Sequence, residues 1–309
     1  DPIVFGKYLN LIDYPNSEKH KKHKIPAASV GGLIIYIVIL NYILISLSSG
    51  LELASSKLLI LFILINFGFW FGIFDDLFKI SAGYRLISLS LILLILSINF
   101  EDFSISSFYS DLLSKEIETL YVEPWFTIIC YIVLYNIFNM LDGINGLLIT
   151  YVLGCLLIIS ISISFPILLT VLIITLLILL LYNLNNKIFL GNNGSAILSL
   201  TIAFLTIEAS KNNKLNFSDV NILILFFLPF IDFIRLFFQR FFSKRNPMKG
   251  DNNHYHHIVL KDMNFIKWGG ALIILFIAFY FIINHVNSLI FFSLLLILYI
   301  YTFWRAKNK

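Results

Sequence analysis

Residues 56–79 read SKLLILFILINFGFWFGIFDDLFK, an apolar run that ends in two adjacent aspartates and a lysine. The apolar part, 56–74, is long enough to cross a bilayer, because a transmembrane helix needs about 20 such residues. Two carboxylates at the end of an apolar helix are costly unless a cation compensates them. This stretch therefore predicts a membrane helix with polar chemistry at one end.

The rest of the chain extends this apolar character. Of its 309 residues, 59% are hydrophobic and 13% are charged, whereas soluble domains carry about 25% charged residues. This composition excludes a water-soluble fold. The formal net charge of +4 is too small to indicate a nucleic-acid partner. We predict an all-α, polytopic integral membrane protein.

Hydropathy predicts about ten transmembrane helices and a single membrane domain over 31–309. The predicted spans are 31–49, 56–74, 84–100, 124–141, 146–165, 166–184, 195–210, 219–238, 265–284 and 286–304. With residues 1–30 in the cytoplasm, every Lys and Arg falls on the cytoplasmic side except Lys57, Lys115, Lys211 and Lys214, which fits the positive-inside rule. The external connection 101–123 is expected to be a solvated loop with one short amphipathic helix.

In this topology the unusual polar segments all face the cytoplasm. The first holds Asp75 and Asp76, followed one helical turn later by Lys79. A divalent metal or a metal-bound phosphate would compensate the acidic pair, although a solvated helix end would explain it as well. Asn139 and Asp142 are three residues apart, so both side chains project from one helix face.

Two further polar segments follow. The Gly-rich run 191–195 precedes a predicted helix and could offer N–H groups to a phosphate, although an ordinary turn with a serine cap explains it equally well. Three of the six histidines then fall within four residues: His254, His256 and His257. Their tight spacing and the absence of nearby cysteines argue against zinc, and the basic residues around Arg245 favour a polyanion. Asp232 and Arg235 can pair at the end of the eighth span.

The order of these motifs resembles the polyprenyl-phosphate N-acetylhexosamine-1-phosphate transferases, glycosyltransferase family 4. The matching elements are the acidic pair, Asn139-x-x-Asp142-Gly, Phe189-x-Gly-x-x-Gly-Ser, Pro229-x-x-Asp232 and His254-x-His-His. The last motif is most similar to the undecaprenyl-phosphate GlcNAc-1-phosphate transferase branch. Members of that branch have one more N-terminal helix, and residues 1–9 resemble its tail, so we expect this helix to be missing.

The resemblance implies transfer of N-acetylhexosamine 1-phosphate from a UDP-sugar to polyprenyl phosphate, with release of UMP. It implies Mg²⁺, with Mn²⁺ as an alternative, and a place in the bacterial inner membrane with the active site facing the cytoplasm. The reaction would be the first membrane step of a cell-envelope polysaccharide pathway, such as lipopolysaccharide or a cell-wall polymer. The donor sugar stays open, and so does a homodimer.

The resemblance also implies roles for individual residues. The implied catalytic residues are Asp75, Asp76, Asp142 and Lys79. The implied substrate-binding residues are Asn139, Asn145, Phe189, Asp232, Arg245, His254, His256 and His257. The implied metal ligands are Asn139, Asp142 and Asn192.

Three residues depart from the family pattern. Asn192 and Asn145 stand where the family usually has aspartate, and Asn252 where it has arginine. An amide oxygen attracts Mg²⁺ less than a carboxylate does, so we expect weaker metal binding or an impaired enzyme. A catalytically impaired relative that binds lipid phosphate is therefore one alternative. A membrane transporter is another, although the lack of charged residues at mid-depth argues against it.

Overall fold

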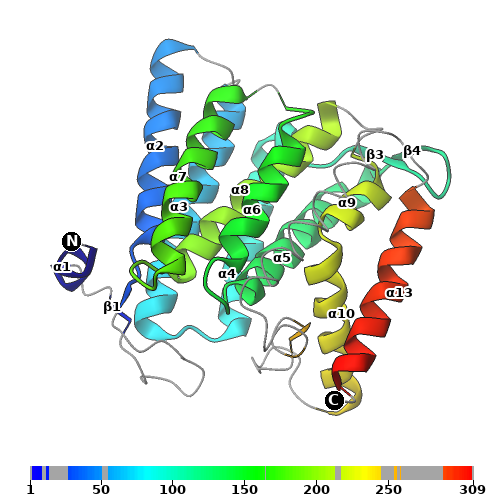
Figure 1. The fold of residues 1–309 in the computed structure, drawn as a ribbon. Helices are drawn as coiled ribbons and strands as arrows, with labels where there is room; N and C mark the ends of the chain where they lie inside the picture. The colour runs from blue at the N-terminus through cyan, green and yellow to red at the C-terminus, as the bar shows by residue number, and fades with distance from the viewer. Residues whose placement is uncertain are drawn as a thin grey trace.

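The computed structural model is mostly helical (Figure 1), as the composition predicts. It describes residues 2–8, 12–13, 27–50, 55–163, 165–212, 217–244, 254–255, 258 and 288–307. Its longer helices are α2 (Gly31–Ser49), α3 (Ser55–Phe78), α4 (Ala82–Asn99), α5 (Glu123–Leu141), α6 (Leu147–Ile159), α7 (Pro166–Leu184), α8 (Gly191–Asn212), α10 (Phe227–Phe242) and α13 (Ser288–Lys307). Two short helices are α1 (Pro2–Tyr8) and α9 (Asp219–Leu225).

Seven of the ten predicted spans are continuous helices long and apolar enough to cross a membrane. They are α2, α3, α4, α5, α7, α8 and α13. The predicted fifth span is too long: α6 has 13 residues and is followed by turns in which Ser160 Oγ donates to the Leu157 carbonyl. Serine hydroxyls that bond nearby backbone compete with helix continuation. The predicted span 265–284 lies outside the described residues.

The eighth predicted span is not one straight helix. α9 and α10 meet at Phe226 with a bend of 86°. Pro229 explains the break, because proline has no N–H to donate to the carbonyl of residue 225, the last residue of α9. Hydropathy registers the apolar length of 219–238 but not this interruption.

The connection 101–123 forms a β-hairpin instead of the expected helix. β3 (Ser107–Ser110) pairs antiparallel with β4 (Lys115–Glu118), between the 3₁₀ turns η1 (Glu101–Phe103) and η2 (Leu120–Val122). The Thr119 hydroxyl closes the hairpin base by donating to the carbonyls of Ile105, at 2.6 Å, and Ser106, at 2.9 Å. Phe108 and Tyr109 suit a strand better than a helix.

The described end of the N-terminal segment is packed against the loop that precedes α8. β2 (Ala27–Ala28) pairs with β1 (Ile12–Asp13), and Ala28 forms a parallel bridge with Ile188. The Phe189 N–H donates to the Ala28 carbonyl at 2.8 Å. Residues 187–190 are therefore held in place by Ala28 of β2 and by the first residues of α2, Gly31 and Gly32, whose N–H groups donate to the Phe189 and Leu190 carbonyls.

Helix α8 is the centre of the bundle. It packs against α2, α3, α5 and α6, and every residue from Asn193 to Ser210 is buried. A helix that is buried all round must satisfy its polar side chains internally. Ser199 and Thr206 do so by donating to carbonyls of their own helix, those of Ala196 and Ile202.

Small residues let the neighbouring helices approach α8 closely. A Cβ atom on Gly72 of α3 would lie 2.2 Å from the Asn193 Cα, and one on Gly68 would lie 3.1 Å from the Ile197 nitrogen. From α2, a Cβ atom on Gly32 would lie 2.4 Å from the Gly194 nitrogen. Glycines spaced four residues apart allow this backbone contact between membrane helices. The contact sets the start of α8 beside the end of α3.

We predict that Gly72→Ala destabilises the protein, because α3 must move away from α8 to admit the methyl group. The expected loss is about 1–3 kcal/mol, visible as a lower thermal unfolding midpoint in detergent micelles. Gly83→Ala is the matched control, since the atom nearest to its Cβ position is the Ser81 Oγ at 4.0 Å. Equal midpoints for the two variants would contradict the close α3–α8 contact.

Candidate active site

The last turn of α3 lies against the first turn of α8. The Asn192 backbone N–H points at the Asp76 carboxylate, 3.1 Å from Oδ2 and 3.2 Å from Oδ1. A carboxylate is favourable here because unpaired N–H groups and the helix dipole make a helix N-terminus positive. Residues 191–195 are thus the first turn of α8 rather than a loop before it. The Asn192 N–H, which the sequence suggested for a phosphate, is given to Asp76.

Asp75, the other member of the acidic pair, is 4% exposed and paired within the protein. Its Oδ2 accepts from Arg85 Nη1 at 3.0 Å and from Asn192 Nδ2 at 3.0 Å. The two adjacent aspartates therefore have different partners: Asp75 pairs with an arginine, and Asp76 accepts a backbone N–H at the start of α8. Arg85 belongs to none of the sequence motifs, although a cation early in the next helix is the expected partner of a buried carboxylate.

Helix α5 brings Asp142 to the same place. Asp142 follows the last residue of α5, and Asn139 lies one turn earlier in the helix. Desolvation and the nearby negative charge of Asp76 raise the pKa of Asp142 to about 8. Tyr135 of α5 is likewise within electrostatic range of Asp75, Asp76 and Arg85. Carboxyl groups from α3 and the end of α5, an arginine from α4 and the first turn of α8 thus converge on one site.

This site offers oxygen ligands that suit Mg²⁺. The candidate donors are the carboxylates of Asp76 and Asp142 and the amide oxygen of Asn192, and Asn139 lies one helical turn before Asp142 on α5. Among the described residues, no three His, Cys, Asp or Glu side chains gather closely enough to form a metal site by themselves. Mg²⁺ commonly takes one or two carboxylates and completes its shell with water and substrate phosphates. The residues therefore fit a metal that is shared with a phosphorylated ligand.

Three other predicted site residues border this site. Lys79 ends α3 with a left-handed backbone (φ 51°), and its N–H donates to the Asp75 carbonyl at 2.9 Å, one helical turn earlier. The Asn145 amide donates to the Asn186 side chain, which ties the α5–α6 turn to the end of α7. Phe189 precedes α8 and is held by the backbone of Ala28.

Asn183, which was not predicted as a site residue, is buried and connects the α5–α6 turn with the residues before α8. It is 5% exposed; its Oδ1 accepts the Gly146 N–H, and its Nδ2 donates to the Ile188 carbonyl at 2.9 Å. One buried amide thus connects the turn after α5 with the loop before α8. The sequence signal for this role was an asparagine inside the last turn of an apolar run, because an amide that becomes buried there needs hydrogen-bond partners.

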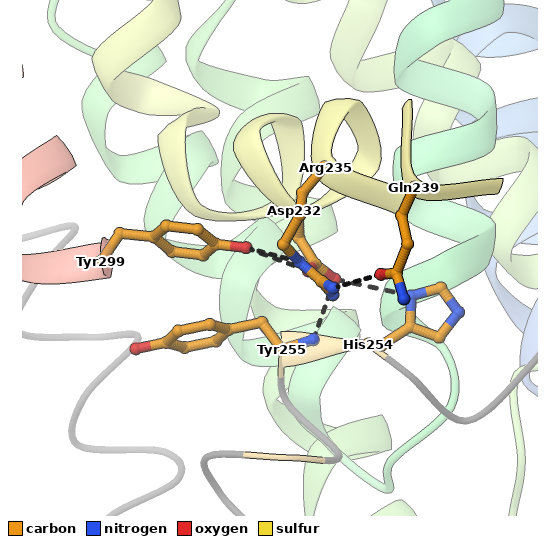
Figure 2. Close-up of polar contacts among 6 residues, drawn as sticks. All are labelled: Asp232, Arg235, Gln239, His254, Tyr255 and Tyr299. Carbon is orange, nitrogen blue, oxygen red and sulfur yellow. Dashed lines mark hydrogen bonds and ion pairs between the residues drawn. The ribbon is translucent and has the colours of Figure 1, made fainter. Parts of the chain in front are cut away.

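A second group of predicted residues gathers on α10 (Figure 2). Asp232 pairs with Arg235, as their spacing predicts, and the His254 Nδ1 lies 3.5 Å from the Asp232 Oδ2. The α3–α4 connection and the C-terminal ends of α10 and α13 lie toward the same, lower side of Figure 1. Arg245, Asn252, His256 and His257 lie outside the described residues.

Geometry and composition together define a multi-pass helical membrane protein with an acidic site built at helix ends. Residues 58–210 match the model of glycosyl transferase family 4. The matched segment, from α3 to α8, is similar to this family and makes up about half of the chain.

Two relatives agree with this assignment, and both are named undecaprenyl-phosphate alpha-N-acetylglucosaminyl 1-phosphate transferase. The protein from Thermotoga maritima is 26% identical over 276 residues, which cover 88% of this chain and 79% of the relative. The protein from Escherichia coli K12 is 25% identical over 275 residues, which cover 83% of this chain and 71% of the relative.

We predict that Arg85→Gln destabilises the protein by about 2–3 kcal/mol, because it leaves the buried Asp75 carboxylate without its cation. Thermal unfolding in detergent would measure the loss. Adding Asp75→Asn to Arg85→Gln should recover most of it, since no uncompensated charge then remains. Lys187→Gln, which removes an exposed cation, is the control. An Arg85→Gln variant as stable as this control would refute the pairing.

Proposed function

We propose that this chain transfers N-acetylhexosamine 1-phosphate from a UDP-sugar to undecaprenyl phosphate or a similar polyprenyl phosphate. In the reaction, an oxygen of the lipid phosphate attacks the β-phosphorus of the UDP-sugar. The bond between that phosphorus and the oxygen of UMP breaks, so UMP leaves and the lipid-linked sugar diphosphate remains. The names of the two relatives, which describe such a transferase, support this proposal.

The observation that carries the proposal is the convergence of Asp76, Asp142 and Asn192 at the ends of helices that are otherwise apolar. A lipid phosphate needs a site at the membrane surface, because its chain stays in the bilayer and its charge does not. A second phosphorylated substrate adds more negative charge, so the site needs cations. We therefore place the reaction at the cytoplasmic face, where the nucleotide is available.

The residues of the site have different roles in this reaction. Arg85 and the Asn192 amide hold Asp75 in place, and these contacts fix the orientation of the last turn of α3, to which Asp75 belongs. Asp76 and Asp142, with Asn139 and Asn192, would hold Mg²⁺. Bound Mg²⁺ would neutralise the diphosphate oxygens and stabilise UMP as it leaves. Lys79, beyond the end of α3, is placed to attract the lipid phosphate, and Phe189 is placed to stack on the uracil.

The direct test is an assay of membranes that contain the protein, supplied with undecaprenyl phosphate, Mg²⁺ and radiolabelled UDP-GlcNAc. We expect a labelled lipid diphosphate and an equal amount of UMP, with at least a hundredfold loss in Asp76→Asn. Glu118→Gln, at an exposed position of β4, should keep full activity. Other UDP-N-acetylhexosamines in parallel reactions identify the donor. If the folded protein transfers none of them, it is not this enzyme, and UMP binding without transfer would indicate an impaired relative.

We further predict that Asn192→Asp makes the protein more dependent on Mg²⁺. The new carboxylate would lie about 3 Å from Asp75, where like charges repel strongly, and a divalent cation would relieve that repulsion. The unfolding midpoint should therefore fall in EDTA and rise more steeply with Mg²⁺ than in the wild type. Asn192→Ala removes the same hydrogen bond without adding charge and is the control. The same Mg²⁺ response in Asn192→Asp and the wild type would count against a metal at this position.

A further inference from the structure

Asp232 is a buried carboxylate whose two oxygens serve different parts of the chain. Oδ1 accepts from Arg235 Nη2 at 2.6 Å, from Arg235 Nε at 3.1 Å and from the Tyr299 hydroxyl at 3.2 Å. Oδ2 accepts from the Tyr255 N–H at 3.0 Å and faces the His254 Nδ1 at 3.5 Å. Both oxygens of the carboxylate are therefore engaged by groups of the protein itself. Asp232 therefore joins α10, residues 254–255 and α13 (Figure 2).

Arg235 is also engaged inside the protein. Besides Asp232, it donates to the Tyr299 hydroxyl from Nε at 3.0 Å and to the Gln239 Oε1 from Nη1 at 3.1 Å. Its guanidinium carbon lies 4.4 Å from the centre of the Phe303 ring, within the range of a cation–π contact. Its charge and most of its donors are thus directed at α10 and α13 rather than at a ligand.

The C-terminal helix α13 holds Tyr255 as well. The Tyr255 hydroxyl lies 2.8 Å from the Thr302 Oγ1, and its ring stacks on Tyr299 with centroids 4.8 Å apart. Tyr255 is therefore fixed at its backbone by Asp232 and at its side chain by α13. His254, the preceding residue, is 8% exposed and has little freedom to move while these contacts hold.

The outer end of α13 is anchored too. The Ser288 Oγ donates to the Asp111 Oδ2 at 2.9 Å, beside the β3–β4 hairpin. Between the two ends, the Phe292 ring packs edge-on against Phe227 of α10, 5.4 Å between centroids. α13 is thus attached at both ends and along its length, so Tyr299 and Thr302 have fixed positions.

We propose that Asp232 and Tyr299 are positioning residues: they hold His254 in the geometry for binding the phosphates of the sugar-nucleotide donor, and α13 is part of the site through them. This inference rests on the proposed function and on the substrate-binding role that the family resemblance implies for His254. It offers an alternative to the predicted direct contact of Asp232 with substrate, because both oxygens of Asp232 are engaged by groups of the protein. α13 lies outside the segment that matches the family model.

The test uses Tyr299→Phe, which removes one hydroxyl and keeps the stacked ring. In the transfer assay we expect the KM for the UDP-sugar to rise roughly tenfold, the value for a lost hydrogen bond to a charged group. The KM for the lipid phosphate should change less than about twofold, because the α3–α8 site is untouched. Thr302→Val should act in the same direction and Thr302→Ser should restore the wild-type KM. Ser293→Ala is the control, since its hydroxyl bonds only within α13.

A second readout does not require activity. Diethyl pyrocarbonate acylates accessible histidines, and peptide mass spectrometry gives the rate at His254. We expect this rate to rise several-fold in Tyr299→Phe and to stay unchanged in Ser293→Ala. If the wild type has no transfer activity but acylation of His254 is still faster in Tyr299→Phe, the proposed transfer reaction is refuted and the positioning of His254 is retained. Unchanged acylation, or an equal rise in both KM values, would overturn the positioning proposal.

Discussion

The antiparallel contact between α3 and α8 determines where everything else in this protein lies. Without side chains at Gly68 and Gly72, the two helices touch along their backbones. Lys57 of α3 pairs with Glu208 of α8 at one end, and Asp76 accepts the Asn192 N–H at the other. Sliding one helix past the other would strip a buried carboxylate of its partner, which is costly in a low-dielectric interior. The register of this pair therefore fixes the acidic site.

Asp75 and Asp232 are buried aspartates that are stabilised in the same way but have different roles in the protein. Asp75 accepts from Arg85 and an amide, and Asp232 accepts from Arg235 and a tyrosine. The network around Asp232 is balanced within the protein, so it suits the task of holding a segment in place. Beside Asp75, Asp76 and Asp142 bring two further carboxyl groups to one site, and burial together with the charge of Asp76 raises the pKa of Asp142. A cation shared with phosphates would favour the ionised form of both carboxyl groups.

Hydropathy predicts the continuous spans well because a run of about 20 apolar residues has few alternatives to a membrane helix. It fails at Phe226 and after Ile159, where a proline and serine hydroxyls end helices inside apolar sequence. The Gly68-x-x-x-Gly72 pattern was a readable signal for close helix packing. For the hairpin at 107–118, the aromatic residues of β3 were a weaker sign, since strand propensity depends strongly on context.

Composition alone places this protein in a membrane, because so much apolar surface cannot be covered in water, and the motifs pick out the polar residues of the candidate site. Which partner each of these residues has depends on how the helices pack. Arg85 could have paired with either aspartate, Asn192 could have offered its side chain to a metal alone, and Tyr299 belonged to no motif. These pairings join residues up to 117 positions apart, and such distances close only when helices pack, so periodicity and spacing along the chain do not encode them.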